Sequence, residues 1–160
     1  MDALLLRDLR SRRPQMRARW EDLLHTEKSS SPLAHPDTLI HLVGWVMEEI
    51  FSELEKSPAP DHPIEARSFD SVRALCPCGR NPYLLVFLAG EQALLEGLIQ
   101  CQAKRRVPSP EDRDRAVAEL YSALRRIAAR EVAAFCDICQ YREDCGPAHQ
   151  PKTARTHPAA

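Results

Sequence analysis

Thirteen prolines divide the 160 residues of this sequence, and their spacing constrains the fold more than any other feature. A proline inside a helix removes one backbone hydrogen bond and clashes with the preceding turn, so long helices must lie between prolines. Four of the gaps between prolines carry apolar residues at helical spacing over most of their length. We therefore predict four helices, at about 15–28, 37–56, 82–105 and 110–136.

Start signals precede three of these helices. Asn81 is a cap residue that stands before a proline at the first helical position. Ser109 repeats that pattern with acidic residues in the first turn, and His35 is followed by a proline and an aspartate. Leucine and alanine, which favour helix, outnumber valine, isoleucine and threonine, which favour strand. These features predict an all-α fold.

The predicted architecture is a single bundle-like domain of four helices that spans residues 1–146. A proline-rich linker is expected at 57–75, ending in a short helix through Val72 and Leu75. Residues 147–160 have few apolar side chains to bury and are expected to form a flexible C-terminal tail.

Charge and the N-terminal residues indicate the expected partners and compartment. A formal net charge of −1 gives no bulk attraction to nucleic acid or to an anionic membrane, and neither partner is expected. A short leucine run precedes an arginine-rich segment, the reverse of a secretory signal, so we expect a cytoplasmic protein. The arginines between Arg7 and Arg19 could bind phosphate or RNA, but nearby acidic residues favour a solvated helix face. No apolar run approaches the length that is needed to span a bilayer. The expected partner is a protein, and the oligomeric state is left open.

Five of the six cysteines fall into two groups that are far apart in the sequence: Cys76 and Cys78, then Cys136, Cys139 and Cys145. The first group precedes the helix predicted at 82–105, and the second group ends and follows the helix predicted at 110–136. A short join makes these two helices antiparallel, so both cysteine groups should lie at the same end of the bundle. Cys101 falls near the opposite end of its helix, where we expect a small buried apolar residue.

Cysteine thiolates that converge in this way are typical ligands of a soft metal. Four thiolates close a structural zinc site, and four also hold a [4Fe–4S] or [2Fe–2S] cluster. A reducing cytosol argues against permanent disulfides, which leaves transient thiol–disulfide exchange and inert thiols as weaker alternatives. All five cysteines are therefore candidate metal and cofactor ligands. No catalytic residue is assigned, and an enzyme with an open metal position is the least favoured class.

The second group reads CDICQYREDC over residues 136–145. It resembles the iron–sulfur cysteine triplet of the AddB class of nucleases and of related CRISPR-associated nucleases. The resemblance implies that Cys136, Cys139 and Cys145 ligate a cluster, with either Cys76 or Cys78 as the fourth ligand. It does not extend to nuclease activity, because the chain has no acidic strand pair followed by Glu-x-Lys.

Two hypotheses follow for the function. In the first, a [4Fe–4S] cluster makes the protein a redox- or oxygen-responsive module or an electron carrier. In the alternative, zinc is held by Cys76, Cys78, Cys136 and Cys139, and the helical protein is an adaptor for protein–protein interaction. The zinc hypothesis leaves Cys145 without a role.

Overall fold

The computed structural model describes residues 1–26, 34–56, 70–74, 76, 79–104 and 109–139. Helix is the only regular structure within these ranges, which confirms the all-α fold class. The helices in chain order are α1 (Ala3–Ser11), α2 (Arg13–Thr26), α3 (Pro36–Lys56), α4 (Asp70–Arg73), α5 (Pro82–Lys104) and α6 (Pro110–Ile138).

The four long helices predicted from proline spacing are α2, α3, α5 and α6, and their bounds agree to within two residues. α4 is the short helix expected near Val72. The start signals are confirmed as well, because Ser109 Oγ accepts a hydrogen bond from Asp112 N at 3.1 Å. Most of the linker and the expected tail at 147–160 lie outside the described residues.

α1 was not predicted, although its capping signal is present in the sequence. Asp2 Oδ2 accepts a hydrogen bond from Leu5 N at 3.1 Å, and the helix buries Leu5 and Leu9 against the core. Pro14 lies in the first turn of α2, where its missing N–H is tolerated. The same proline has no N–H with which to continue α1, so the chain changes direction near Arg12.

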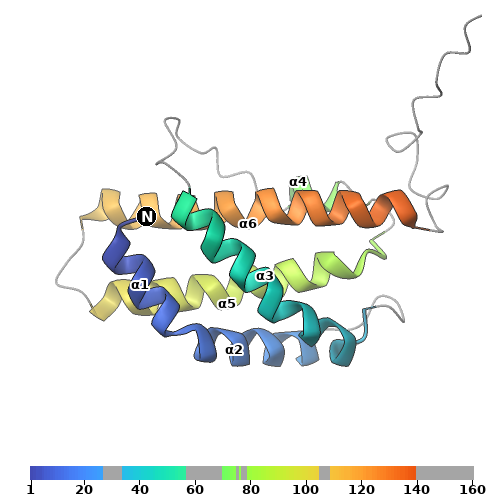
Figure 1. Ribbon diagram of the computed structural model, residues 1–160, viewed down its shortest axis with the longest axis horizontal. Helices are drawn as coiled ribbons and strands as arrows, with labels where there is room; N and C mark the ends of the chain where they lie inside the picture. The colour runs from blue at the N-terminus through green and yellow to red at the C-terminus, as the bar shows by residue number, and fades with distance from the viewer. Residues whose placement is uncertain (27–33, 57–69, 75, 77–78, 105–108, 140–160) are drawn as a thin grey trace, which may run out of the picture.

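α5 is the central helix of the bundle. It contacts α1, α2, α3 and α6, and α6 runs antiparallel beside it while α3 crosses both obliquely (Figure 1). Apolar side chains on several sides of α5 are fully buried, including Val86, Phe87, Leu94 and Leu98. A helix that is apolar around most of its circumference must be surrounded in this way to be stable in water.

The expectation that no segment is long and apolar enough to span a bilayer is wrong for α5. Its most apolar window of 18 residues has a mean hydropathy of 1.4, and 56% of that window is buried inside the fold. The central helix of a helical bundle has the same length and composition as a membrane span. Length and composition therefore do not distinguish the central helix of a bundle from a membrane span.

α2 approaches α5 closely through a buried aromatic side chain. Trp20 is fully buried, and its Nε1 donates a hydrogen bond to Val86 O at 2.9 Å. Its ring lies against Gly90, where a Cβ atom would overlap three ring atoms. Gly97 receives Met16 in the same manner, with Met16 Cγ only 2.7 Å from the position of a Cβ. Glycine at these two positions permits the close approach of the helices.

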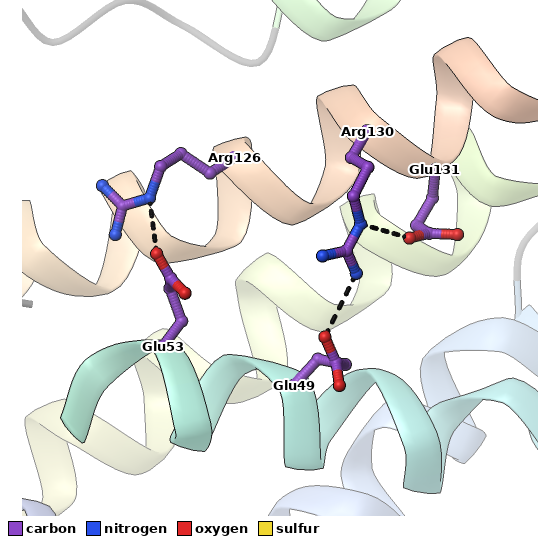
Figure 2. A network of polar contacts seen from close by, with 5 residues as sticks. All are labelled: Glu49, Glu53, Arg126, Arg130 and Glu131. Atoms are coloured by element: carbon purple, nitrogen blue, oxygen red, sulfur yellow. Dashed lines mark hydrogen bonds and ion pairs between the residues drawn. The ribbon is translucent and has the colours of Figure 1, made fainter. Parts of the chain in front are cut away.

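α3 and α6 are joined along their exposed rim by ion pairs (Figure 2). Arg126 Nε lies 2.9 Å from Glu53 Oε1, and Arg130 contacts Glu49 at 3.1 Å and Glu131 at 2.7 Å. Buried apolar side chains lie on both helices, among them Val46, Ile50, Leu124 and Ile127.

Two kinds of side chain are exposed on the surface of the bundle. The N-terminal arginines lie on a solvated helical face as predicted, where Arg10 pairs with Glu55 at 2.8 Å and Arg19 with Glu96 at 2.8 Å. Trp45, in contrast, is an aromatic side chain that is 41% exposed. It lies off the buried stripe of α3, and the helices that pack on α3 do not cover its whole circumference.

Candidate metal centre

The start of α5 and the end of α6 meet at one end of the bundle, as the antiparallel arrangement predicts (Figure 1). Asn81 Nδ2, just before α5, donates hydrogen bonds to Val132 O at 3.0 Å and to Cys136 Sγ at 3.6 Å. Beside this contact, the rings of Tyr83 in the first turn of α5 and Phe135 near the end of α6 meet edge to face with their centroids 6.2 Å apart. The residues that follow the first cysteine group therefore lie against the helix that carries Cys136.

Cys76 is held by a short anchored turn. Its N–H donates to Arg73 O at the end of α4, and its carbonyl accepts from Gly79 N–H, both at 3.0 Å. Gly79 has a φ of +66°, a left-handed conformation that costs glycine little and lets the chain turn back towards α5. Val72 in α4 is 2% exposed, and α4 contacts α6. Cys76 is therefore linked to α6 on both sides, through α4 before it and through Asn81 after it.

The downstream cysteines lie where α6 ends. Cys136 faces the fold and is 2% exposed, whereas Cys139 caps the helix and is partly exposed. Cys139 N–H donates to Cys136 O at 3.4 Å, and its extended backbone carries the chain out of the helix. Ile138, the residue before Cys139, is 82% exposed. One sulfur of this pair is therefore enclosed, and the other is close to solvent.

The two helix ends carry opposite partial charges. The amino end of α5 is positive and favours thiolates, while the carboxyl end of α6 is negative and favours a cation. The last turn of α6 contains no basic residue, so no side chain of that turn supplies the cation. Burial, followed by the charge of Glu131, raises the pKa of the Tyr83 phenol. Tyr83 therefore adds no negative charge to this end of the bundle near neutral pH. Thiolates near the amino end of α5 and a metal ion near the carboxyl end of α6 would each meet a partial charge of the opposite sign.

Three of the five predicted ligands are described: Cys76, Cys136 and Cys139. Cys78 and Cys145 lie outside the described residues. Within the described ranges, no three Cys, His, Asp or Glu side chains are grouped closely enough to hold a metal ion. The described part of the fold therefore has Cys76, Cys136 and Cys139 at one end of the bundle, but it does not show a closed ligand set.

Cys101, which was excluded from the site, is 3% exposed and lies near the far end of α5. Twenty residues of helix separate it from Asn81, a span of about 30 Å at 1.5 Å per residue. Its expected role as a small buried residue agrees with this position.

The sulfur donors fit a thiolate-bound metal or cluster, and the Asn81 contact adds an N–H donor to one sulfur. The sequence predicts Asn81 as a helix cap, and the structure shows the capping contact together with the contact to sulfur. Comparison with known proteins adds no relative, because no family model, curated protein or solved structure matches this chain. The function must therefore be argued from the residues themselves.

Proposed function

We propose that this protein binds an iron–sulfur cluster where α5 begins and α6 ends, and acts as a small redox- or oxygen-responsive module or electron carrier. Its ligands are Cys136, Cys139 and Cys145, with Cys76 or Cys78 as the fourth. The observation that carries the proposal is the contact between Cys136 Sγ and Asn81, which stands three residues after Cys78 in the sequence.

The chemistry of this end of the bundle supports a thiolate-bound metal. A thiolate at the carboxyl end of α6 would face the negative end of the helix dipole, which is unfavourable unless positive charge or N–H donors compensate. Iron or zinc supplies the positive charge, and the Asn81 amide supplies one donor. An iron–sulfur cluster at such a site provides one-electron redox chemistry.

The third downstream cysteine supports iron–sulfur over zinc. The triplet of residues 136–145 resembles the cluster ligands of AddB-class nucleases, whereas a four-thiolate zinc site needs only Cys76, Cys78, Cys136 and Cys139. The position of Cys139 near the surface, beside the exposed Ile138, suits exchange of electrons with a protein partner or contact with an oxidant. A reducing, cytoplasmic compartment would keep the ligands as thiols until the cluster forms.

A structural zinc site remains the second candidate, and burial is the observation that favours it. Cys76 and Cys136 are each 2% exposed, as ligands of a closed structural site often are. Zinc would link the turn before α5 to the end of α6 and stabilise the fold. The protein would then be a helical adaptor, with its function on a protein-binding face.

Anaerobic purification of the whole chain separates these two proposals. We expect brown protein with charge-transfer absorption in the blue part of the visible spectrum. It should contain about four iron and four acid-labile sulfide ions per chain. Colourless protein that carries one equivalent of zinc would overturn the cluster and support the adaptor.

Two cysteine substitutions provide a matched comparison. Cys145→Ser should remove most of the iron if the cluster is present, and should leave metal content unchanged if four-thiolate zinc is present. Cys101→Ala, at the other end of α5, should leave metal content unchanged in both cases. Loss of metal in the Cys101 variant would contradict the proposed location of the site.

A further inference from the structure

Asn81 forms more hydrogen bonds than a helix cap needs. The residue is 2% exposed, and its Oδ1 accepts a hydrogen bond from Tyr83 N–H at 3.0 Å, which is the capping contact. Its Nδ2 carries two N–H donors, and the partners within reach are Val132 O and Cys136 Sγ. The separation of 3.6 Å from the sulfur suits an N–H···S bond, because sulfur is larger than oxygen. Both ends of the buried amide are therefore satisfied.

The capping role alone does not select asparagine. A cap requires only an acceptor, and serine, threonine or aspartate would serve. The other long helix of this pair is capped by Ser109, which accepts from Asp112 N–H. Asparagine differs from these residues because it adds N–H donors, and at position 81 those donors reach α6. Asparagine at position 81 therefore suits the contact between the start of α5 and α6.

The two acceptors of Asn81 belong to one turn of α6. In an α-helix the carbonyl of residue 132 also accepts the backbone N–H of residue 136, so the amide binds the turn that orients Cys136. The same amide directs an N–H at the sulfur of that cysteine. Asn81 therefore constrains both the backbone and the sulfur of one proposed ligand.

We infer that Asn81 is a positioning residue of the metal centre, which holds Cys136 Sγ in place and donates a hydrogen bond to it when the sulfur binds metal. This inference rests on the proposed function. Outer hydrogen-bond partners of metal ligands raise metal affinity by orienting the ligand. A donor to a cluster thiolate also stabilises the more negative, reduced state, which raises the reduction potential.

Two substitutions separate the cap from the donor. Asn81→Ser keeps an oxygen that can accept from Tyr83 N–H but is too short to reach α6. Asn81→Asp keeps the shape and the cap but has no N–H to offer. Ser109→Ala removes a cap at the opposite end of the bundle and serves as the matched control for a loss of helix stability alone.

The first measurement uses Cd²⁺ as the probe, in a spin-active isotope bound to the full chain. Wild-type protein should show nuclear scalar coupling between the Asn81 side-chain N–H and the metal through Cys136 Sγ. Both Asn81 variants should lose that signal and bind Cd²⁺ at least about tenfold more weakly. Ser109→Ala should bind Cd²⁺ as wild type does.

The second measurement is the reduction potential of the iron-loaded protein. Both Asn81 variants should shift it to more negative values, whereas Ser109→Ala should leave it unchanged. Wild-type protein that binds neither Cd²⁺ nor iron overturns the proposed function and this inference together. Wild-type protein that binds metal without the coupling, or Asn81 variants with unchanged affinity and potential, overturn this inference alone. If a variant fails to fold, the coupling in the wild-type protein decides.

Discussion

α2 lies against α5 through side chains that fill the space left by glycines, whereas α3 meets α6 with ion pairs along an exposed rim (Figure 2). The first contact depends on a few atoms at close approach. The second is distributed over several charges that water also reaches. The difference shows where this fold tolerates substitution and where it does not.

The α2–α5 contact follows from the geometry of both helices. Gly90 and Gly97 are seven residues apart on α5, which places them two turns apart on one face. Met16 and Trp20 are four residues apart on α2, so they also share a face and meet the two glycines. Trp20 adds its Nε1 hydrogen bond to Val86 O, which orients the ring.

The α3–α6 rim carries less energy per contact. The side chains of Arg126 and Arg130 are 46% and 55% exposed, and those of Glu53 and Glu49 are 34% and 40% exposed. Exposed ion pairs contribute about 0–1 kcal/mol, because solvent screens the charges and ordering long side chains costs entropy. The stability of this helix pair therefore comes mainly from its buried apolar side chains.

The largest expected effect is at Gly90. Gly90→Ala should reduce the free energy of unfolding by about 3 kcal/mol, because the added methyl group overlaps a rigid and fully buried ring. Chemical denaturation provides the measurement. Gly44→Ala on α3 is the control, since its Cβ would meet only an Arg17 nitrogen at 3.8 Å. That variant should be as stable as wild type or gain up to about 1 kcal/mol from helix propensity. Equal stability of the two variants would contradict the proposed contact.

Gly97→Ala should have a smaller effect at the other end of the same interface. The new methyl group would meet the flexible Met16 side chain, with Cγ at 2.7 Å and Leu9 Cδ1 at 3.7 Å. Methionine can change rotamer, so we expect a loss of about 1–2 kcal/mol. A double-mutant cycle with Met16→Ala should show coupling between the two positions. Strictly additive losses would show that Met16 is not the side chain that limits this approach.

Glu91 on α5 allows a test of a charge that is more buried than those of the rim. Burial raises the pKa of its carboxyl above the ordinary value of 4.5, and Arg125 opposes that shift. Within the described residues, Glu91 Oε2 has no hydrogen-bond partner. A raised pKa in the folded state means a stability contribution that is full below pH 4.5 and is lost as the pH rises through the raised value.

Glu91→Gln should remove this pH-dependent contribution. Above the raised pKa the variant should be slightly more stable than wild type, by less than about 1 kcal/mol because the group is partly solvated. The difference should shrink or reverse towards pH 4. Stability curves of both proteins between pH 4 and pH 7 provide the measurement. Parallel curves would show that Glu91 has an ordinary pKa in the folded protein.

The sequence predicted the helices better than their contacts, for physical reasons. Proline positions and cap residues are local signals, so Asn81 and Ser109 marked helix starts correctly. α1 was not predicted although Asp2 caps it, because a short leucine run before an arginine-rich segment bears on targeting as well as on helix formation. The apolar side chains of α5 point in every direction, so nothing in its pattern indicated that Gly90 would face Trp20.

The candidate site shows the same difference between local signals, which the sequence carries, and contacts between helices, which it does not. The short join between α5 and α6 predicted that the two cysteine groups would lie at one end, and the Asn81 contact with α6 confirms that arrangement of the helices. Which residue of α6 faces Asn81 depends on rotation of the helix about its axis, and one residue corresponds to about 100°. For that reason the sequence predicts the cap at Asn81 but does not identify Cys136 as its partner on α6.

The smallest expected effect is on the α3–α6 rim. Arg130→Gln removes the charge that pairs with Glu49 and Glu131, and Arg126→Gln removes the partner of Glu53. Each should reduce the free energy of unfolding by about 0.5 kcal/mol at low salt. In 1 M salt, where charges are screened beyond about 3 Å, these losses should largely vanish.

Salt therefore distinguishes the two kinds of helix contact within one protein. The cost of Gly90→Ala is steric overlap, which salt does not screen, so it should be equal at low and high ionic strength. The stability loss of Gly90→Ala should consequently become larger relative to that of Arg126→Gln or Arg130→Gln as salt is added. A rim loss that persists in 1 M salt would mean that Arg130 acts through its aliphatic stem, packed on the apolar surface between the helices, rather than through its charge.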